Sequence, residues 1–169
     1  MLLLISDANV IIDLEAGDIL EALFQLPYDF AMPDVLYEEE IKDGSPDLLN
    51  MGLKTLVVES QYVDYAIALG EVHGDEPGFY DRLALSLAKQ EACPLLTGDS
   101  NLRALAGHEG VDIRGTLWVL AELIEFGLLT PEKGLASLDL MKARKRRLPW
   151  DNAKQQIERA SYGVRQSGA

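Results

Sequence analysis

The sequence predicts an α/β fold in which a central parallel sheet is covered by helices on both faces. Short apolar runs of strand length alternate along the chain with segments whose apolar residues recur at helical spacing. Two of the runs, Leu2–Ser6 and Leu95–Thr97, have the composition of fully buried strands. Because strands that alternate with helices pair in parallel, both observations indicate the same architecture.

The first half of the chain contains three predicted strands. Leu2–Ser6 leads through the turn Asp7-Ala8-Asn9 into a short helix, and apolar residues at helical spacing indicate a second helix after it. Pro33 suits the first turn of a third helix, which runs through the segment VLYEEEI. In order, the predicted elements are the strand Leu2–Ser6, the helices Val10–Ala16 and Asp18–Leu26, the strand Tyr28–Met32, the helix from Pro33 to Ile41, and the strand Lys54–Glu59.

In the second half, the loop His73–Gly78 separates two helices, since it contains two glycines and a proline. A buried strand, a helix, a short last strand and three helices follow. The predicted elements are the helices Gln61–Val72 and Phe79–Gln90, the strand Leu95–Thr97, the helix Asp99–Ala106, the strand Val111–Ile113, and the helices Thr116–Phe126, Pro131–Lys145 and Trp150–Ala160.

Composition narrows the class of protein. A chain of 169 residues fits one domain, and 48% hydrophobic with 25% charged residues excludes a disordered chain. No apolar run approaches the roughly 18 residues that a membrane span requires, so we expect no membrane association. Cys93 is the only cysteine, which excludes an intrachain disulfide and favours a buried thiol in the reducing cytoplasm. His73 and His108 are too few and too unpatterned to suggest a zinc site, so we expect ordinary surface roles.

Charge is distributed unevenly along the chain. Residues 142–169 carry eight Lys or Arg against two acids, a net charge of +6, which leaves −19 for residues 1–141 out of a total of −13. The basic stretch Lys142–Arg147 has two interpretations. It is the solvated end of a helix, where cations are favoured by the dipole, or it holds a phosphate backbone or the acidic face of a partner.

Four acids stand out because of where the predicted elements place them. Asp7 and Asp99 follow the first strand and the strand PLLT, at the sheet edge where ligands bind. Either is also a candidate helix N-cap, although Asn9 would serve equally in place of Asp7. Asp81 lies in the first turn of its helix, where a negative charge is favoured in any case. Glu38 belongs to a run of three acids, of which at most two point at the crevice if Val35 and Leu36 face inward.

Carboxylates gathered at one sheet edge repel one another unless a divalent cation lies between them. Such hard oxygen ligands suit Mg²⁺ or Mn²⁺, and the chemistry typical of such a site is metal-assisted hydrolysis of phosphodiesters.

In this order and at these spacings, the motifs resemble those of PIN-domain proteins, especially the small ribonucleases of VapC-type toxin–antitoxin pairs. The resemblance covers roughly residues 1–130, whereas the basic extension lies outside it. Its elements are a strand ending in Asp7-Ala8-Asn9 with Asp13 further on, a proline-led helix with Glu38 as the best match and Glu39 as the second choice, the segment Asp81–Ala88, the motif from Thr97-Gly98-Asp99 to Leu102, and the segment RGTLWVLAELIEFGLLT.

The resemblance implies a three-layer α/β/α PIN-like fold, with a domain over residues 1–130 and a helical extension over 131–169 in the same domain. It implies an endoribonuclease in which Asp7, Asp81 and Asp99 hold one or two Mg²⁺ or Mn²⁺ ions, with Glu38 nearby. Asn9 and Asn101 are candidate supporting residues that orient water or phosphate. The implied partners are an RNA substrate, a cognate antitoxin protein and a second copy of the chain.

Other functions fit the sequence less well. Haloacid-dehalogenase-like phosphatases need a second aspartate at the position of Asn9, and response-regulator receivers need a lysine after a late strand, which is absent between Pro94 and Arg114. No glycine-rich phosphate loop is present. The remaining alternative is a catalytically inactive PIN-fold interaction module, which cleavage of single-stranded RNA with and without EDTA distinguishes from the enzyme.

Overall fold

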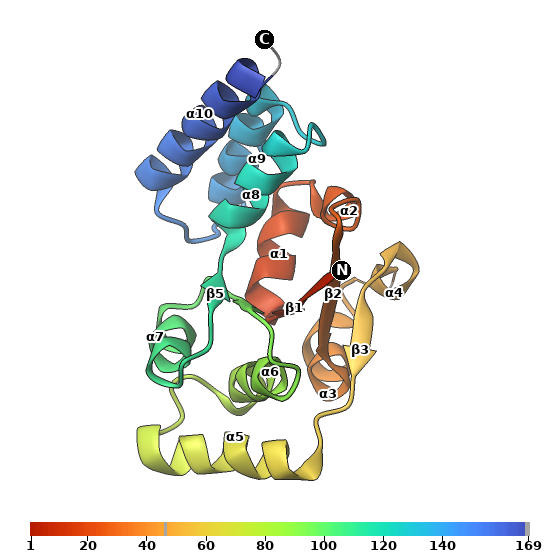
Figure 1. Cartoon of the computed structure of the whole chain (residues 1–169), viewed down its shortest axis with the longest axis vertical. Coiled ribbons are helices and arrows are strands. Elements are labelled where there is room, and N and C mark those ends of the chain that lie inside the picture. Colours follow the sequence, from red (N-terminus) through yellow and green to blue (C-terminus); the bar gives the residue numbers. More distant parts are fainter. Residues whose placement is uncertain (46, 168–169) are drawn as a thin grey trace. The chain divides into compact units, whose positions relative to one another are not determined.

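The computed structural model of the chain describes residues 1–45 and 47–167. Within these residues, five strands form one all-parallel sheet in the order β3-β2-β1-β4-β5 (Figure 1). The predicted three-layer α/β/α fold with a central parallel sheet flanked by helices is confirmed. The strands are β1 (Leu2–Ser6), β2 (Tyr28–Pro33), β3 (Lys54–Leu56), β4 (Leu95–Leu96) and β5 (Ile113–Arg114).

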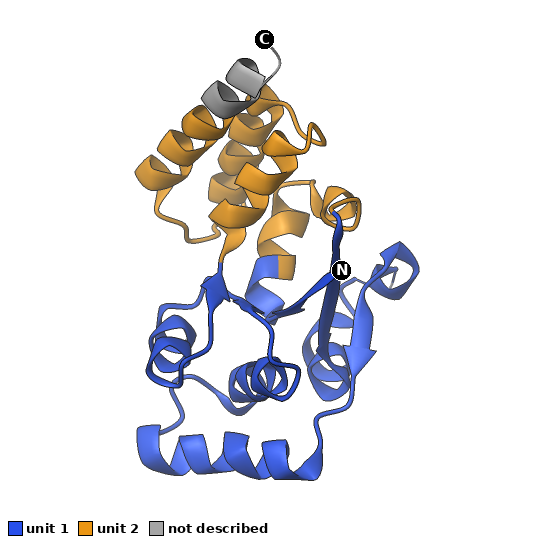
Figure 2. Cartoon of the chain, in the orientation of Figure 1, with its two compact units in different colours: residues 1–10, 27–114 blue, residues 11–26, 115–169 orange. Residues whose placement is uncertain are grey.

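The chain divides into two compact units, shown in Figure 2. Unit 1, residues 1–10 and 27–114, contains the whole sheet. Its helices are α3 (Asp34–Leu36), the π-helical turn η1 (Tyr37–Ile41), α4 (Leu48–Met51), α5 (Ser60–His73), α6 (Phe79–Gln90) and α7 (Ser100–His108).

Unit 2, residues 11–26 and 115–169, is helical in its described part. Helix α1 begins in unit 1 and continues into unit 2. The expected organisation, a domain over residues 1–130 with an extension over 131–169, stays a prediction. The helices are α1 (Ala8–Ala16), α2 (Leu20–Leu23), α8 (Thr116–Glu125), α9 (Pro131–Ala143) and α10 (Trp150–Ser167).

Strand β1 is the centre of the sheet and determines where a ligand can bind. Leu4 pairs with Phe30 of β2 on one side, and Ser6 pairs with Leu96 of β4 on the other. The order of the strands therefore reverses next to β1. In parallel sheets, ligands bind outside the carboxyl ends of the strands at such a reversal. The residues that follow β1 and β4 are thus at the edge where chemistry is expected.

The buried runs of the sequence became the core of unit 1. Leu4, Ile5, Leu95 and Leu96 are fully buried, as predicted, but Leu2 is 45% exposed, so the prediction that the whole strand Leu2–Ser6 is buried was wrong at its start. Helix α6 has the predicted bounds, and its residues Leu83, Ala84, Leu87 and Ala88 are buried, as their helical spacing indicated. Helix α6 packs against β1, β2 and β4, so the first turn of α6 is held rigidly relative to the sheet.

Several element boundaries differ from the prediction. The helix expected over Asp18–Leu26 is only Leu20–Leu23, because Asp18 has a positive φ of 56° that a helix cannot contain. The third strand stops at Leu56 rather than at Glu59. The short helix Leu48–Met51 was not predicted, since four residues are too few to show a helical period.

The thiol of Cys93 is half-buried, so the expectation of a buried thiol was only partly right. Burial and the charge of Glu91 raise its pKa to about 11, whereas a hydrogen bond with the backbone of Ile5 lowers it. A thiol with such a pKa is almost entirely protonated at neutral pH and is a poor nucleophile.

In unit 2, Asp13 is a buried acid with structural partners. Its side chain accepts a hydrogen bond of 2.9 Å from the Thr116 hydroxyl and one of 2.6 Å from Nε of Arg146. Asp13 is 4% exposed, so its charge would be costly without these partners. Asp13 therefore links α1 to α8 and to the basic stretch through its side chain.

The basic stretch Lys142–Arg147 begins at the end of α9, as its interpretation as a helix end required. Arg144 donates to the carbonyl of Ala16 at 2.8 Å and to Asp18 at 3.0 Å. Two of the five cations, Arg144 and Arg146, are thus used inside unit 2, whereas Lys142, Lys145 and Arg147 are exposed. A role for these three toward phosphate or a partner stays a prediction. Among the described residues, no helix combines the length and apolar composition needed to cross a membrane.

Candidate active site

Asp7 follows β1 and is completely buried. Its backbone N–H donates to the Leu96 carbonyl at 3.0 Å, which extends the ladder between β1 and β4 by one residue. Its carboxylate caps α1 by accepting from the Val10 N–H at 3.0 Å, so Asp7 rather than Asn9 is the cap. Capping does not prevent a carboxylate from binding a metal ion, because its two oxygens offer about four lone-pair positions.

Thr97 connects Asp7 to Asp99. The Thr97 hydroxyl is fully buried and donates a short hydrogen bond to the second oxygen of Asp7. The same hydroxyl accepts from the backbone N–H of Asp99 at 3.1 Å. Asp99 in turn caps α7 by accepting from the Leu102 N–H at 2.8 Å. The two aspartates therefore lie at the same edge of the sheet, joined through one side chain.

Asp81 lies in the first turn of α6 and is half-buried. Burial is the main cause that raises the pKa of Asp81 from 3.8 to about 6. The negative charges of Asp99, Glu40 and Glu76 raise that pKa further, and the neighbouring Arg82 lowers it only in part. Asp81 and Asp99, far apart in sequence, are thus close enough to repel each other.

The guanidinium of Arg82 holds the start of α6 in place. It donates to the carbonyl of Ala66 at 3.0 Å and to that of Pro77 at 2.8 Å. At Gly70 of α5, an added Cβ would lie 2.5 Å from the Arg82 guanidinium, so a side chain there would displace it. Arg82 is buried, and its hydrogen bonds keep the Asp81 turn fixed against α5.

Of the three acids in the run, Glu40 is the one whose charge raises the pKa of Asp81. Glu38 forms an exposed ion pair of 3.0 Å with Lys42 and is absent from the charges that shift the pKa of Asp81. Partial burial raises the pKa of the Glu40 carboxyl, and Glu40 is among those charges. The choice of Glu38, with Glu39 as the second choice, stays a prediction, and Glu40 is added to it as a candidate.

The acidic run lies in the π-helical turn η1, in which the Lys42 N–H donates to the Tyr37 carbonyl five residues earlier. The prediction assumed α-helical spacing with Val35 and Leu36 inward. Leu36 is buried, but Val35 is exposed. The wider turn gives the three acids directions that differ from those of an α-helix, and such turns are frequent at functional sites.

The two candidate supporting residues differ in their surroundings. Asn101, in the first turn of α7, donates from its side-chain amide to Glu76 at 3.2 Å. It therefore orients an acid that contributes to the field at Asp81. Asn9 is half-buried in the first turn of α1. Sequence reasoning did not select Glu76 or Thr97, although Thr97 lies within the motif that identified Asp99.

The side chains at the carboxyl ends of β1 and β4 offer ligand atoms that suit a hard divalent cation. Every donor is a carboxylate oxygen, and after burial the largest cause that raises the pKa of Asp81 is the negative charge of Asp99. A dication between them removes this repulsion, which a neutral ligand or a monocation would do less well. Asp7, Asp81 and Asp99 are the residues that would hold it, after side-chain movement, since their carboxylate oxygens do not all lie within 4.8 Å of one another.

The shifted pKa of Asp81 predicts how the metal-free protein responds to pH. The folded state binds the proton more tightly than the unfolded chain, so stability is highest below about pH 4 for this group. This contribution to stability is lost as pH rises toward about 6. Above that pH, the ionised Asp81 destabilises the folded state by its full amount. We expect Asp81→Asn, in EDTA, to be more stable than the wild type by about 1–2 kcal/mol at pH 8, after allowing for screening by solvent.

Urea denaturation at pH 4 and pH 8 measures this difference, which should be close to zero at the lower pH. Asp64→Asn offers a control, since it removes an exposed acid from α5 and should change stability by less than about 0.5 kcal/mol. A less stable Asp81→Asn variant at pH 8 without metal would contradict the electrostatic picture.

Comparison with known proteins identifies the family of the chain. The sequence model of a family described as PIN domain matches residues 3–162. A search of curated proteins found no match. PIN domains are in general nucleases and usually bind divalent metals. The matched range covers the sheet, every acid of the site and most of the helical part, so the chain belongs to the PIN-domain family.

Proposed function

We propose that the protein is a metal-dependent endoribonuclease that hydrolyses phosphodiester bonds in RNA. The observation that carries the proposal is the cluster of Asp7, Asp81 and Asp99, in which Asp99 raises the pKa of Asp81 and Thr97 links Asp99 to Asp7. Membership of the PIN-domain family supports it.

In this proposal, Asp7, Asp81 and Asp99 hold one or two Mg²⁺ or Mn²⁺ ions, and Glu40 takes the place first assigned to Glu38. When bound, such an ion lowers the pKa of a coordinated water and neutralises charge on the phosphate. Thr97 fixes the orientation of the Asp7 carboxylate through its hydroxyl.

The substrate is held by the chain's own groups as well. Helices α1 and α7 both begin at this edge, capped by Asp7 and Asp99, so the positive ends of their dipoles favour an anionic phosphate. Asn9 and Asn101, in the first turns of the same helices, are neutral donors that can orient water or a phosphate oxygen.

The biological role that fits best is that of the toxin in a type II toxin–antitoxin pair acting in the cytoplasm. An arginine from an antitoxin could cap the acidic edge and exclude the metal. A homodimer is also part of the proposal, since α5 exposes the apolar side chains of Ile67 and Val72. A small reading frame directly upstream, whose product neutralises toxicity on co-expression, would support this role.

Cleavage of single-stranded RNA tests the proposal. We expect cleavage with Mg²⁺ or Mn²⁺, none with EDTA, and restoration when the ion is returned. Glu40→Gln should lower the rate by about 10-fold or more, whereas the matched change Glu38→Gln should leave it unchanged. If RNA survives under every metal condition, the chain is a catalytically inactive interaction module instead.

A further inference from the structure

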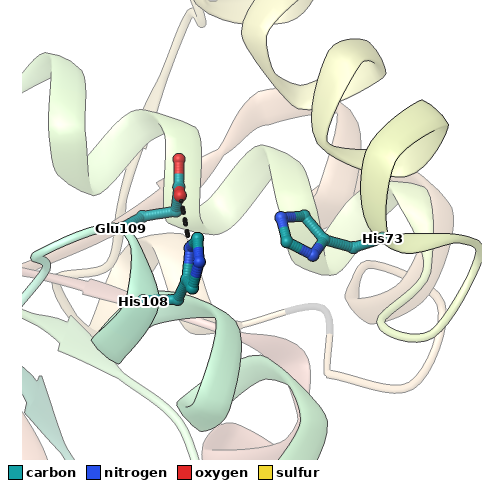
Figure 3. Close-up of side chains that lie close together, drawn as sticks. All are labelled: His73, His108 and Glu109. Atoms are coloured by element: carbon teal, nitrogen blue, oxygen red, sulfur yellow. Dashed lines mark hydrogen bonds and ion pairs between the residues drawn. The ribbon is translucent and has the colours of Figure 1, made fainter.

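A second cluster of metal-ligating side chains lies in unit 1, outside the acidic edge. It consists of His73, His108 and Glu109, which sequence reasoning had placed as ordinary surface residues or had not selected. One ligand atom from each lies within 4.8 Å of the others. Figure 3 shows the two imidazole rings close together on different helices in an edge-to-face arrangement, with the Glu109 carboxylate beside His108. The ring centroids are 5.2 Å apart.

Two helix ends bring these residues together. His73 is the last residue of α5, and His108 is the last residue of α7, with Glu109 directly after it. Both helices are long enough for a dipole to matter, with 14 and 9 residues. Their carbonyl ends carry partial negative charge, which favours a cation at this place. The carbonyl ends of the two helices and the Glu109 carboxylate thus all favour a bound cation.

The Glu109 carboxylate is oriented by Tyr65, which lies outside the cluster, and by His108 within it. One carboxylate oxygen accepts a short hydrogen bond from the Tyr65 hydroxyl, and the other lies 2.9 Å from Nδ1 of His108. Lys89 donates to the Glu109 backbone carbonyl at 3.1 Å and to the Tyr65 hydroxyl at 3.2 Å. Partners of this kind hold metal-binding carboxylates in place in other proteins.

We propose that His73, His108 and Glu109 form a binding site for a transition-metal dication of the zinc class. Imidazole nitrogens favour such ions over Mg²⁺, which prefers oxygen ligands and retains its waters. Three protein ligands leave a fourth position for water in a tetrahedral site.

The distances permit this geometry after a small adjustment. In a tetrahedral zinc site with bonds of about 2.0–2.1 Å, the ligand atoms lie about 3.3 Å from one another. The present ligand atoms are within 4.8 Å. Both histidines are exposed, so rotation of their side chains can close the remaining gap without moving the helices.

This site is separate from the acidic edge. Asp99 caps the start of α7, whereas His108 closes its end. With a rise of about 1.5 Å per residue, the nine residues of α7 separate the two ends by roughly 13 Å. A metal at the histidine site therefore connects the ends of α5 and α7 and does not share ligands with Asp99.

Calorimetric titration of the full chain with Zn²⁺, in excess Mg²⁺ to saturate the carboxylate site, tests the proposal. We expect one zinc ion per chain with affinity in the micromolar range or tighter. His73→Gln and His108→Gln should each weaken binding by about 10-fold or more. Asp81→Asn and Glu71→Gln, an exposed acid on the same helix as His73, should leave it unchanged.

A second readout uses the fact that the chain has two histidines, both in this cluster. Zinc should shift the imidazole NMR signals of both rings together, and it should raise the melting temperature of the wild type but not of the histidine variants. Undetectable zinc binding, or equal affinity in the wild type and both histidine variants, would overturn the proposal. Since both replaced side chains are exposed, the variants are expected to fold normally.

Discussion

Replacement of Asp7 by asparagine is expected to abolish metal-dependent RNA cleavage, with a loss of about 100-fold or more. The change removes one negative charge from a fully buried position and hardly alters the volume of the side chain. Asparagine retains an oxygen that can accept from the Val10 N–H, so α1 keeps its cap. The loss should therefore come from weakened metal binding rather than from unfolding. Initial rates of cleavage at saturating Mg²⁺ measure it.

The control for Asp7→Asn is Glu39→Gln, which removes an exposed acid from the run in η1. Circular dichroism should show both variants folded, and Glu39→Gln should cleave RNA at the wild-type rate. A folded Asp7→Asn variant with undiminished cleavage would remove Asp7 from the metal site.

Replacement of Arg146 by alanine is expected to lower the free energy of unfolding by about 2–4 kcal/mol. The Asp13 carboxylate is buried, and without Arg146 it keeps the Thr116 hydroxyl but loses its opposite charge. A buried charge without its counter-ion is more destabilising than the loss of an exposed ion pair. The Arg146 side chain is 26% exposed, which places the effect below that of a fully buried pair.

The neighbouring Arg147 is exposed and provides a matched control for Arg146. Arg147→Ala should change stability by less than about 0.5 kcal/mol. Urea denaturation of the two variants at neutral pH measures the difference. Equal stability of Arg146→Ala and Arg147→Ala would show that the ion pair between Arg146 and Asp13 does not stabilise unit 2.

The fold and the placement of Asp7 and Asp99 at one edge of the sheet could be predicted from the apolar runs and from the rules of parallel sheets. A run such as Leu2–Ser6 has no polar residue that a fully buried strand would reject, and parallel strands bring their carboxyl ends to one edge of the sheet. The residues after β1 and β4 must therefore approach each other, whichever loops connect them. Asp7 and Asp99 follow from this rule alone.

Other parts of the site depend on contacts that a linear pattern does not contain. The charge of Glu40 affects Asp81 from a π-helical turn, η1, in which Tyr37 and Ile41 are buried, and a pattern of α-helical spacing does not predict such a turn. Similarly, His73 and His108 come together because two helices end at one place. A spacing rule detects neither case.

Thr97 illustrates a third limitation. Its hydroxyl links Asp7 and Asp99, but a threonine at the end of a buried strand is common for its propensity alone. The sequence analysis included Thr97 in the motif around Asp99 but predicted no function for it. The role follows only from the pairing of β1 with β4.

Calorimetric titration with Mn²⁺ tests most directly whether the acids form a dication site. The wild type should bind Mn²⁺ at neutral pH, and binding should weaken as pH falls below about 6, where Asp81 takes up a proton. Asp81→Asn and Asp99→Asn should each weaken binding by about 10-fold or more, whereas Glu38→Gln should not. Equal Mn²⁺ affinity in the wild type, Asp81→Asn and Asp99→Asn would contradict the account.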